Sequence, residues 1–266
     1  MDDLDLYAYV LTHASDSRNF VAIGKIPATL GGSFQVLINL VSPINWLFSG
    51  RNGIDENIKV FNGFALTGGL FKRVTSVNFY DEASRQSNSV IIRQEYLGVD
   101  SQSKESLIVK TEVDGTIPSV DPDSQVIFKD FKQEYTKYRK GLIKSNGELF
   151  YEITSIRNSQ SFKSYRIDYS DEITFSECPH LSETGSTTHR VNSKRVFVRF
   201  TKGDSLVRFS AANFIYPSEI ADDPCESNTC SIYAECVADS EMPTNYSCVC
   251  KVGFEGDGFN CYGKFN

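Results

Sequence analysis

Residues Ser33–Phe48 read SFQVLINLVSPINWLF, an almost unbroken apolar run in an otherwise mixed sequence. The run is too long for one strand and predicts a helix around residues 36–49. Pro43 suits the first turn of a helix, where its missing N–H donor is not needed, and Ser42 suits the N-cap before it. A helix that is apolar on every side has to be buried on every side.

The sequence around this run, residues 6–214, alternates between apolar and polar side chains with the period of a β-strand. Two turn signals stand between such stretches: Asn146-Gly147, which suits a two-residue type I′ hairpin, and Lys202-Gly203-Asp204. About ten to twelve short strands in one domain indicate a barrel or a large sandwich. We expect the strands at residues 6–12, 20–26, 61–67, 70–80, 90–98, 107–113, 126–131, 149–155, 165–169, 173–175, 195–202 and 206–214.

A helix buried on every side fits among many strands when it runs inside a barrel. The predicted fold class is therefore mainly β: a large antiparallel β-barrel with a buried central helix, the architecture of the eleven-stranded can of the green fluorescent protein. The alternative is a helix that closes one open end of the barrel.

Six of the seven cysteines lie between Cys225 and Cys261, and the gaps between them hold four, five, eleven, one and ten residues. So short a segment cannot bury enough apolar surface to fold without crosslinks. Zinc is a poor alternative, because the segment has no repeated CxxC pair and no histidine. Since disulfides persist outside the reducing cytosol, the chain is predicted to be extracellular.

This cysteine spacing, with the run Gly253–Gly258 behind the fifth cysteine, resembles an epidermal-growth-factor-like (EGF-like) module. Six cysteines permit 15 pairings. The fall in cysteine density upstream predicts a barrel domain at 1–218, an acidic, proline-bearing linker at 219–224 and the module at 225–261. Of the possible pairings, the resemblance implies Cys225–Cys236, Cys230–Cys248 and Cys250–Cys261.

Length and charge narrow the class of protein further. The chain has 266 residues and a net charge of −7, which argues against nucleic acid as the main ligand. No apolar run reaches the roughly 18 residues that span a bilayer. The start, Met1–Asp5, is acidic where a secretion signal would be basic and then apolar. The chain is therefore expected to be a piece of a longer secreted protein.

Six blocks, spread in order over nearly the whole chain, resemble the β-barrel domain of the nidogens (entactins) and the EGF-like module behind it. The resemblance implies the same barrel with an internal helix, without a chromophore, because the helix lacks the Tyr-Gly pair that cyclisation needs. Nidogens carry strand-forming residues before the position of Asp5, so the resemblance implies a barrel that lacks its first strand and has two unpaired edges. The blocks are residues 5–10, 22–31, 45–48, 61–69, 173–178 and 248–258.

The resemblance also implies a function. Nidogens link basement-membrane networks, and their barrel binds the proteoglycan perlecan, through an immunoglobulin-like module, and collagen IV. Carried over by position, the protein-binding residues are Arg73, Asp100, Asp204 and Arg208. Arginine is a frequent interface anchor because its planar fork pairs bidentately with carboxylates. Two alternatives stay open: Arg73 as a buried, paired barrel residue, and Asp204 as a residue that only shapes its turn.

Catalytic chemistry is not expected. The three histidines, His13, His180 and His189, have no metal-ligand spacing, and no GxSxG or HExxH motif is present. We therefore predict a protein that is not an enzyme and needs no metal or cofactor. Calcium is not expected at the module, because Pro224 stands where a ligand residue precedes the first cysteine.

Two single positions carry further predictions. Asn245 begins the sequon Asn245-Tyr246-Ser247 and is predicted to be glycosylated. Cys178 is the odd seventh cysteine; the resemblance implies a bond to a module outside this chain, and the alternative is a buried free thiol.

The predicted function is thus adhesion within the extracellular matrix of the basement membrane. Two alternatives remain: a hemicentin-like matrix protein with the same pair of domains, and a soluble receptor ligand that acts through residues 225–261. The basic run at 132–140 is interpreted as a solvated strand or loop rather than a site for sulfated sugar.

Overall fold

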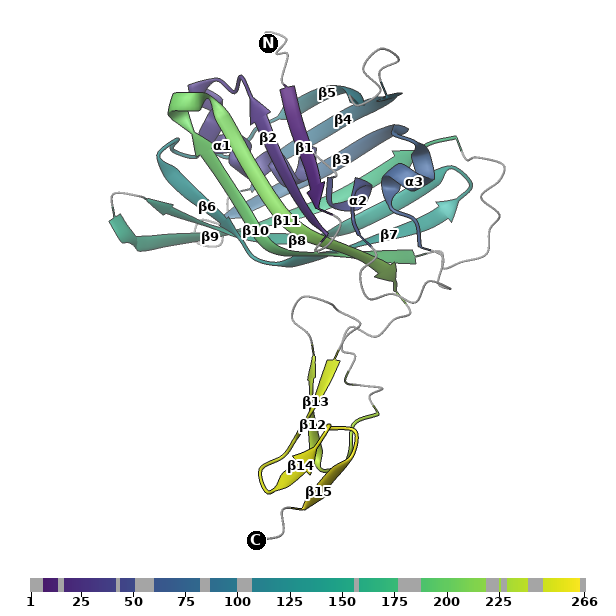
Figure 1. The fold of residues 1–266 in the computed structure, drawn as a ribbon. Helices are drawn as coiled ribbons and strands as arrows, with labels where there is room; N and C mark the ends of the chain where they lie inside the picture. The colour runs from purple at the N-terminus through teal and green to yellow at the C-terminus, as the bar shows by residue number, and fades with distance from the viewer. Residues whose placement is uncertain are drawn as a thin grey trace.

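The protein is mainly β, and most of its strands belong to one 11-stranded sheet that curves around a helix (Figure 1). The computed structural model describes residues 7–13, 17–41, 44–50, 60–81, 87–99, 107–155, 158–176, 188–218, 225, 229–238 and 246–263. The strands of the large sheet are β1 (Tyr7–His13), β2 (Arg18–Gly24), β3 (Leu70–Asp81), β4 (Ser87–Val99), β5 (Leu107–Gly115), β6 (Ser124–Phe128), β7 (Phe131–Arg139), β8 (Leu142–Ser155), β9 (Asn158–Thr174), β10 (Thr188–Thr201) and β11 (Leu206–Pro217).

Neighbouring strands are antiparallel throughout, in the order β1-β2-β11-β10-β7-β8-β9-β3-β4-β5, with β6 paired to β8. In Figure 1 the strands β1, β2, β11 and β10 form the front wall and β3, β4 and β5 the back wall. Inward-facing side chains of β2–β4 and β6–β11 meet in one core. The predicted antiparallel barrel is confirmed.

The helix inside the barrel, α1 (Ala28–Val41), contributes Val36, Leu37, Ile38 and Leu40 to that core. Its side chains pack among residues of both walls, so the alternative of a helix closing one end does not hold. The predicted range of 36–49 is wrong, because the helix begins eight residues earlier and α2 (Ile44–Leu47) is a separate short helix. Ser42 and Pro43 lie outside the described residues.

Two glycines explain the early start of α1. Glycine lowers helix propensity, which is why Gly31 and Gly32 were not expected inside a helix. Here the barrel wall passes so close that no side chain fits. A Cβ on Gly31 would lie 2.2 Å from the ring of Phe200, and one on Gly32 would lie 2.0 Å from the carbonyl oxygen of Val120. The glycines therefore let the helix pass along the wall.

The strand predicted at 61–67 is wrong, because this segment contains the helix α3 (Gly63–Thr67). Asn62 is its N-cap, and its side-chain oxygen accepts a hydrogen bond from the N–H of Ala65 at 2.9 Å. Gly68 ends the helix in the left-handed conformation, with φ of 59°. These two caps outweigh the weak alternation of the segment.

The hairpin predicted at Asn146-Gly147 is also wrong, since β8 runs straight through it. Asn146 pairs with Glu134 of β7 on one side and with Ser170 of β9 on the other. Gly147 instead makes room for Tyr169, whose phenolic oxygen would lie 2.8 Å from an added Cβ. The turn predicted at 202–204 is present as the short 3-10 helix η1 (Lys202–Asp204).

A β-bulge interrupts β10 between Lys194 and Phe197, where three steps along β10 face two steps along β11. Arg195 has a φ of 55°, and its N–H donates to a carboxylate oxygen of Asp130 at 2.8 Å. The extra residue changes the phase of the strand. Val191 faces inward before the bulge, and Val198 faces inward after it.

The strands β1 and β5 are the two ends of the strand order, and within the described residues neither has a second neighbour. Their inward-facing side chains are consequently exposed. Val109 is exposed although Tyr96, opposite it on β4, is buried; Thr12 is exposed although Asn19, opposite it on β2, is buried. Solvent therefore reaches inward-facing side chains along this part of the wall.

The cysteine-rich segment forms two small hairpins, β12 (Ala234–Ala238) with β13 (Tyr246–Cys250) and β14 (Phe254–Gly256) with β15 (Cys261–Gly263). Tyr233 stacks on Phe254, with ring centroids 4.4 Å apart. Most large apolar side chains here are exposed, so the crosslinks stabilise the unit more than its core does. The disulfides are Cys225–Cys236, Cys230–Cys248 and Cys250–Cys261, the pairing that the EGF-like resemblance implies.

Candidate functional site

Arg208 lies on the outer face of the barrel, at the start of β11. Its neighbours Val207 and Phe209 point into the core, so strand alternation turns the arginine outward. The guanidinium donates to the hydroxyl of Thr201 at 2.8 Å and to a carboxylate oxygen of Asp204 at 3.3 Å, and the arginine side chain remains 47% exposed. Such an exposed ion pair contributes little to stability, so the arginine is available to a partner.

Arg73 does not belong to this outer face, and its prediction as an exposed binding residue is wrong. Its side chain is 1% exposed, because β3 places Phe71, Arg73 and Thr75 on the inner face. The guanidinium donates to both carboxylate oxygens of Asp171, at 3.0 and 2.8 Å. The alternative of a buried, paired barrel residue is correct.

The buried arginine joins the wall to the central helix. Its Nη1 donates to the carbonyl oxygen of Leu40 and, at 3.1 Å, to the side-chain oxygen of Gln94. Leu40 lies in the last turn of α1, where a cation also complements the helix dipole. Burial opposes the charged form, but Asp171 outweighs it and raises the pKa of Arg73. This cluster therefore fixes the helix and is not a binding site.

The other residues predicted for function lie outside the described part of the structure. They are Asp100, Cys178 and Asn245.

The sequence did not single out the neighbours of Arg208 across the wall. Arg199 lies opposite it on β10, with Ala22 and then Tyr9 on its other side, so four outward-facing residues form one row over β10, β11, β2 and β1. Arg199 and Tyr9 are exposed. The bulge in β10 hid this row, because it shifts the phase of every residue after it.

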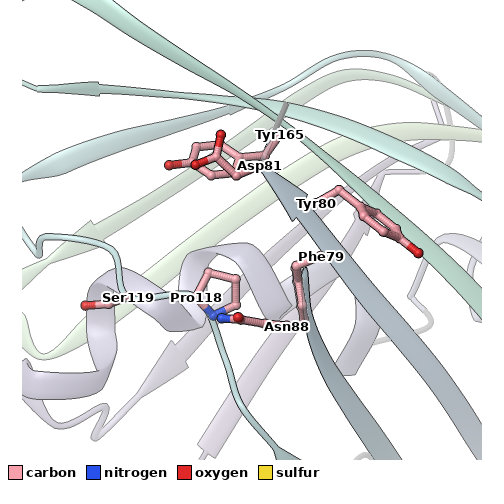
Figure 2. Close-up of a pocket in the computed structure, with 7 residues that line it drawn as sticks. All are labelled: Phe79, Tyr80, Asp81, Asn88, Pro118, Ser119 and Tyr165. Carbon is pink, nitrogen blue, oxygen red and sulfur yellow. The ribbon is translucent and has the colours of Figure 1, made fainter. Parts of the chain in front are cut away.

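A pocket of about 220 Å³ lies beside the end of β3 (Figure 2). Tyr165 stacks on Tyr151 with ring centroids 5.1 Å apart, and burial together with the carboxylate of Asp81 raises the pKa of Tyr165. Pockets that bind small organic ligands usually exceed about 300 Å³, so this one is not assigned a ligand. Its lining residues are Phe79, Tyr80, Asp81, Asn88, Pro118, Ser119 and Tyr165.

Metal ligation and membrane insertion have no support in the described ranges. Within the residues described above, no group of three or more His, Cys, Asp or Glu side chains is arranged to hold a metal ion. No helix in that part of the chain has the length and apolar character needed to cross a membrane.

Comparison with known proteins agrees with the fold and the order of its parts. Human nidogen-1 is 28% identical over 98% of this chain, and the chain spans 20% of the length of nidogen-1. The solved structure of domain G2 of mouse nidogen-1 matches with a TM-score of 0.63 and 27% identity, covering 80% of this chain and 78% of that one. The predicted resemblance to the nidogen barrel is confirmed.

Fluorescent proteins share the fold alone. The cyan fluorescent protein dsFP483 from Discosoma striata matches with a TM-score of 0.56 at 11% identity, covering 81% of this chain and 90% of that one. The family model for the G2-F domain matches residues 1–182. The chain therefore belongs to the G2-F domain family.

Proposed function

We propose that the chain is a non-catalytic adhesion module of the extracellular matrix, secreted into the basement membrane. Its likeness to nidogen-1 extends over both the barrel and the cysteine-rich segment, which favours a nidogen-like role over a hemicentin-like one. The three disulfides agree with an oxidising compartment. The partners we propose are a perlecan-type proteoglycan, bound through an immunoglobulin-like module, and collagen IV.

The observation that carries the proposal is the presentation of Arg208. Antiparallel strands on both sides hold β11 in place, so little conformational freedom is lost when its side chains dock. Asp204 holds the guanidinium from one side and leaves about half of the side chain exposed. An arginine oriented in this way can donate two parallel hydrogen bonds to a carboxylate of a partner.

The test is surface plasmon resonance of the purified chain against an immobilised perlecan immunoglobulin-like module and, separately, collagen IV. We expect binding to at least one of them, and a loss of about 30-fold on Arg208→Ala, the size of an interface hot spot. Arg93→Ala removes an equally outward-facing arginine on β4 and serves as the control. If the folded wild-type chain binds neither probe, or if R208A binds as the wild type does, the proposal is wrong.

A further inference from the structure

A second row of outward-facing residues lies beside the row of Arg208. It follows the same four strands, and its two aromatic rings are separated by a small serine. Phe20 is 41% exposed and Phe197 is 43% exposed, which is unusual for large apolar side chains on a wall that already has a complete core behind it. In order across β1, β2, β11 and β10, the row consists of Leu11, Phe20, Ser210 and Phe197.

The row of Arg208 contains an arrangement that folding does not favour. Arg199 and Arg208 lie directly opposite each other on adjacent strands. Like charges in this position repel each other. Asp204 compensates the charge of Arg208, but no carboxylate in the described residues pairs with Arg199. The pair of arginines is therefore understandable as a site for an anionic group that comes from outside.

The exposed apolar residues of the second row indicate what kind of molecule carries that anionic group. Aromatic side chains and arginines together are typical of the central residues of protein interfaces. A sulfated polysaccharide would make little use of Phe20 and Phe197, and the net charge of −7 would repel a long polyanion. Apolar area next to two cations instead fits a folded protein.

We propose that these residues form an arginine–aromatic patch that binds a folded protein partner through carboxylates placed beside an apolar surface. The patch consists of Tyr9, Leu11, Phe20, Phe197, Arg199 and Arg208. The inference rests on the proposed function and deepens it, because it extends the site around Arg208 and states the chemistry of the partner. The carboxylates pair with the two arginines, and the apolar side chains of the partner cover Phe20 and Phe197.

The experiment measures binding to the immobilised probe that binds the wild-type chain, over a range of salt concentrations. The test variants are Arg199→Ala and Phe197→Ser. The matched controls are Arg93→Ala and Phe150→Ser, which remove an outward-facing arginine and an exposed aromatic ring from other strands of the same sheet. We expect each test variant to weaken binding at least about tenfold and each control to stay within about twofold.

The salt dependence adds a readout that a general loss of packing would not give. Removing Arg199 should flatten the dependence of the dissociation constant on ionic strength, because one charge pair is lost. The urea midpoint of R199A should stay unchanged or rise, since like-charge repulsion is relieved. A lower midpoint together with an unchanged salt slope would overturn the assignment of Arg199.

The outcomes separate the two proposals. If R208A loses binding while R199A and F197S bind normally, the proposed function stands and the patch is wrong. If the wild type binds neither probe, the patch is tested alone, by titrating the ¹⁵N-labelled chain with a soluble peptide of alternating aspartate and leucine. Amide shifts centred on Arg199 and Arg208 that vanish in R199A support the patch, and their absence at millimolar peptide overturns it.

Discussion

Arg73 and Asp171 form a two-pronged ion pair in the middle of the barrel, with Nε–Oδ1 at 3.0 Å and Nη2–Oδ2 at 2.8 Å. Both side chains are almost completely buried, at 1% and 0% exposure. Thr75 donates a further hydrogen bond to the same carboxylate. The fold therefore depends on a charged cluster at the place where a barrel would ordinarily be filled by apolar side chains.

Neutralising one partner of this pair should be costly. Asp171→Asn leaves the guanidinium buried without its counter-charge, and we expect the free energy of unfolding to fall by about 3–5 kcal/mol. Urea unfolding followed by the fluorescence of Trp46, the single tryptophan, measures it. Asp168→Asn, in a partly exposed pair with Arg166 on the same strand, should cost less than about 1 kcal/mol.

If D171N does not fold at all, the double variant Arg73→Met with Asp171→Leu decides the matter. Removing both charges should restore much of the stability, because apolar residues of similar volume replace buried ion pairs well. A D171N protein as stable as the wild type would show that the pair does not hold the barrel.

Alkaline pH should destabilise the barrel through Tyr169. Burial, and then the charge of Asp171, raise its pKa to about 12 in the folded protein, against about 10 in an unfolded chain. The unfolded state therefore loses its proton first. The stabilising contribution is complete below about pH 10 and is lost as the pH rises to about 12, with a size of roughly 3 kcal/mol. Urea unfolding from pH 8 to 12 should show a steeper decline for the wild type than for Tyr169→Phe, and parallel curves would refute this.

The contact between α1 and the wall should tolerate no added methyl group at Gly32. Its Cβ would meet the backbone of Val120, which cannot rotate aside, so Gly32→Ala should cost about 1–3 kcal/mol or more. Gly31→Ala should cost less, because the ring of Phe200 can tilt away. Gly203→Ala has no atom within 4 Å of its added Cβ and serves as the control. Thermal unfolding ranks the three, and equal midpoints would contradict the close approach.

The exposed edge at β5 should promote self-association of the isolated chain. Val109→Lys places a charge on the inner face of the edge, a device that blocks edge-to-edge pairing. Sedimentation velocity at increasing concentration should show less association than for the wild type. Val74→Lys adds the same charge on the outer face of β3, away from the edge, and should leave association unchanged. A monomeric wild-type chain would rule the prediction out.

Periodicity was enough to predict the barrel and the buried helix, because both follow from which side chains must avoid water. The strand boundaries and the turn at 202–204 were close for the same reason. The helix start was missed at Gly31 and Gly32, where a close approach of two segments outweighed local propensity. The false hairpin at Asn146-Gly147 has the same origin, since Gly147 makes room for Tyr169 on the next strand. Contacts between distant residues are not visible to local patterns.

The candidate site was predicted only in part. Arg208 could be placed outside because Val207 and Phe209 flank it, and the structure agrees. Arg73 was assigned by position in a family, although its alternation with Phe71 already indicated an inner face. Arg199 was not found, because alternation counted from the start of β10 places it on the wrong side of the wall.

That miscount has a consequence for how the surface can change. Without the extra residue held at Arg195, the side chains from Phe197 onward would exchange sides, and Arg199 would be carried toward the core. One inserted or deleted codon in this short stretch could thus remake the whole exterior of β10 while its hydrogen-bonded backbone stayed in place. The bulge is a point at which a family with a constant scaffold can gain or lose a partner in a single genetic event.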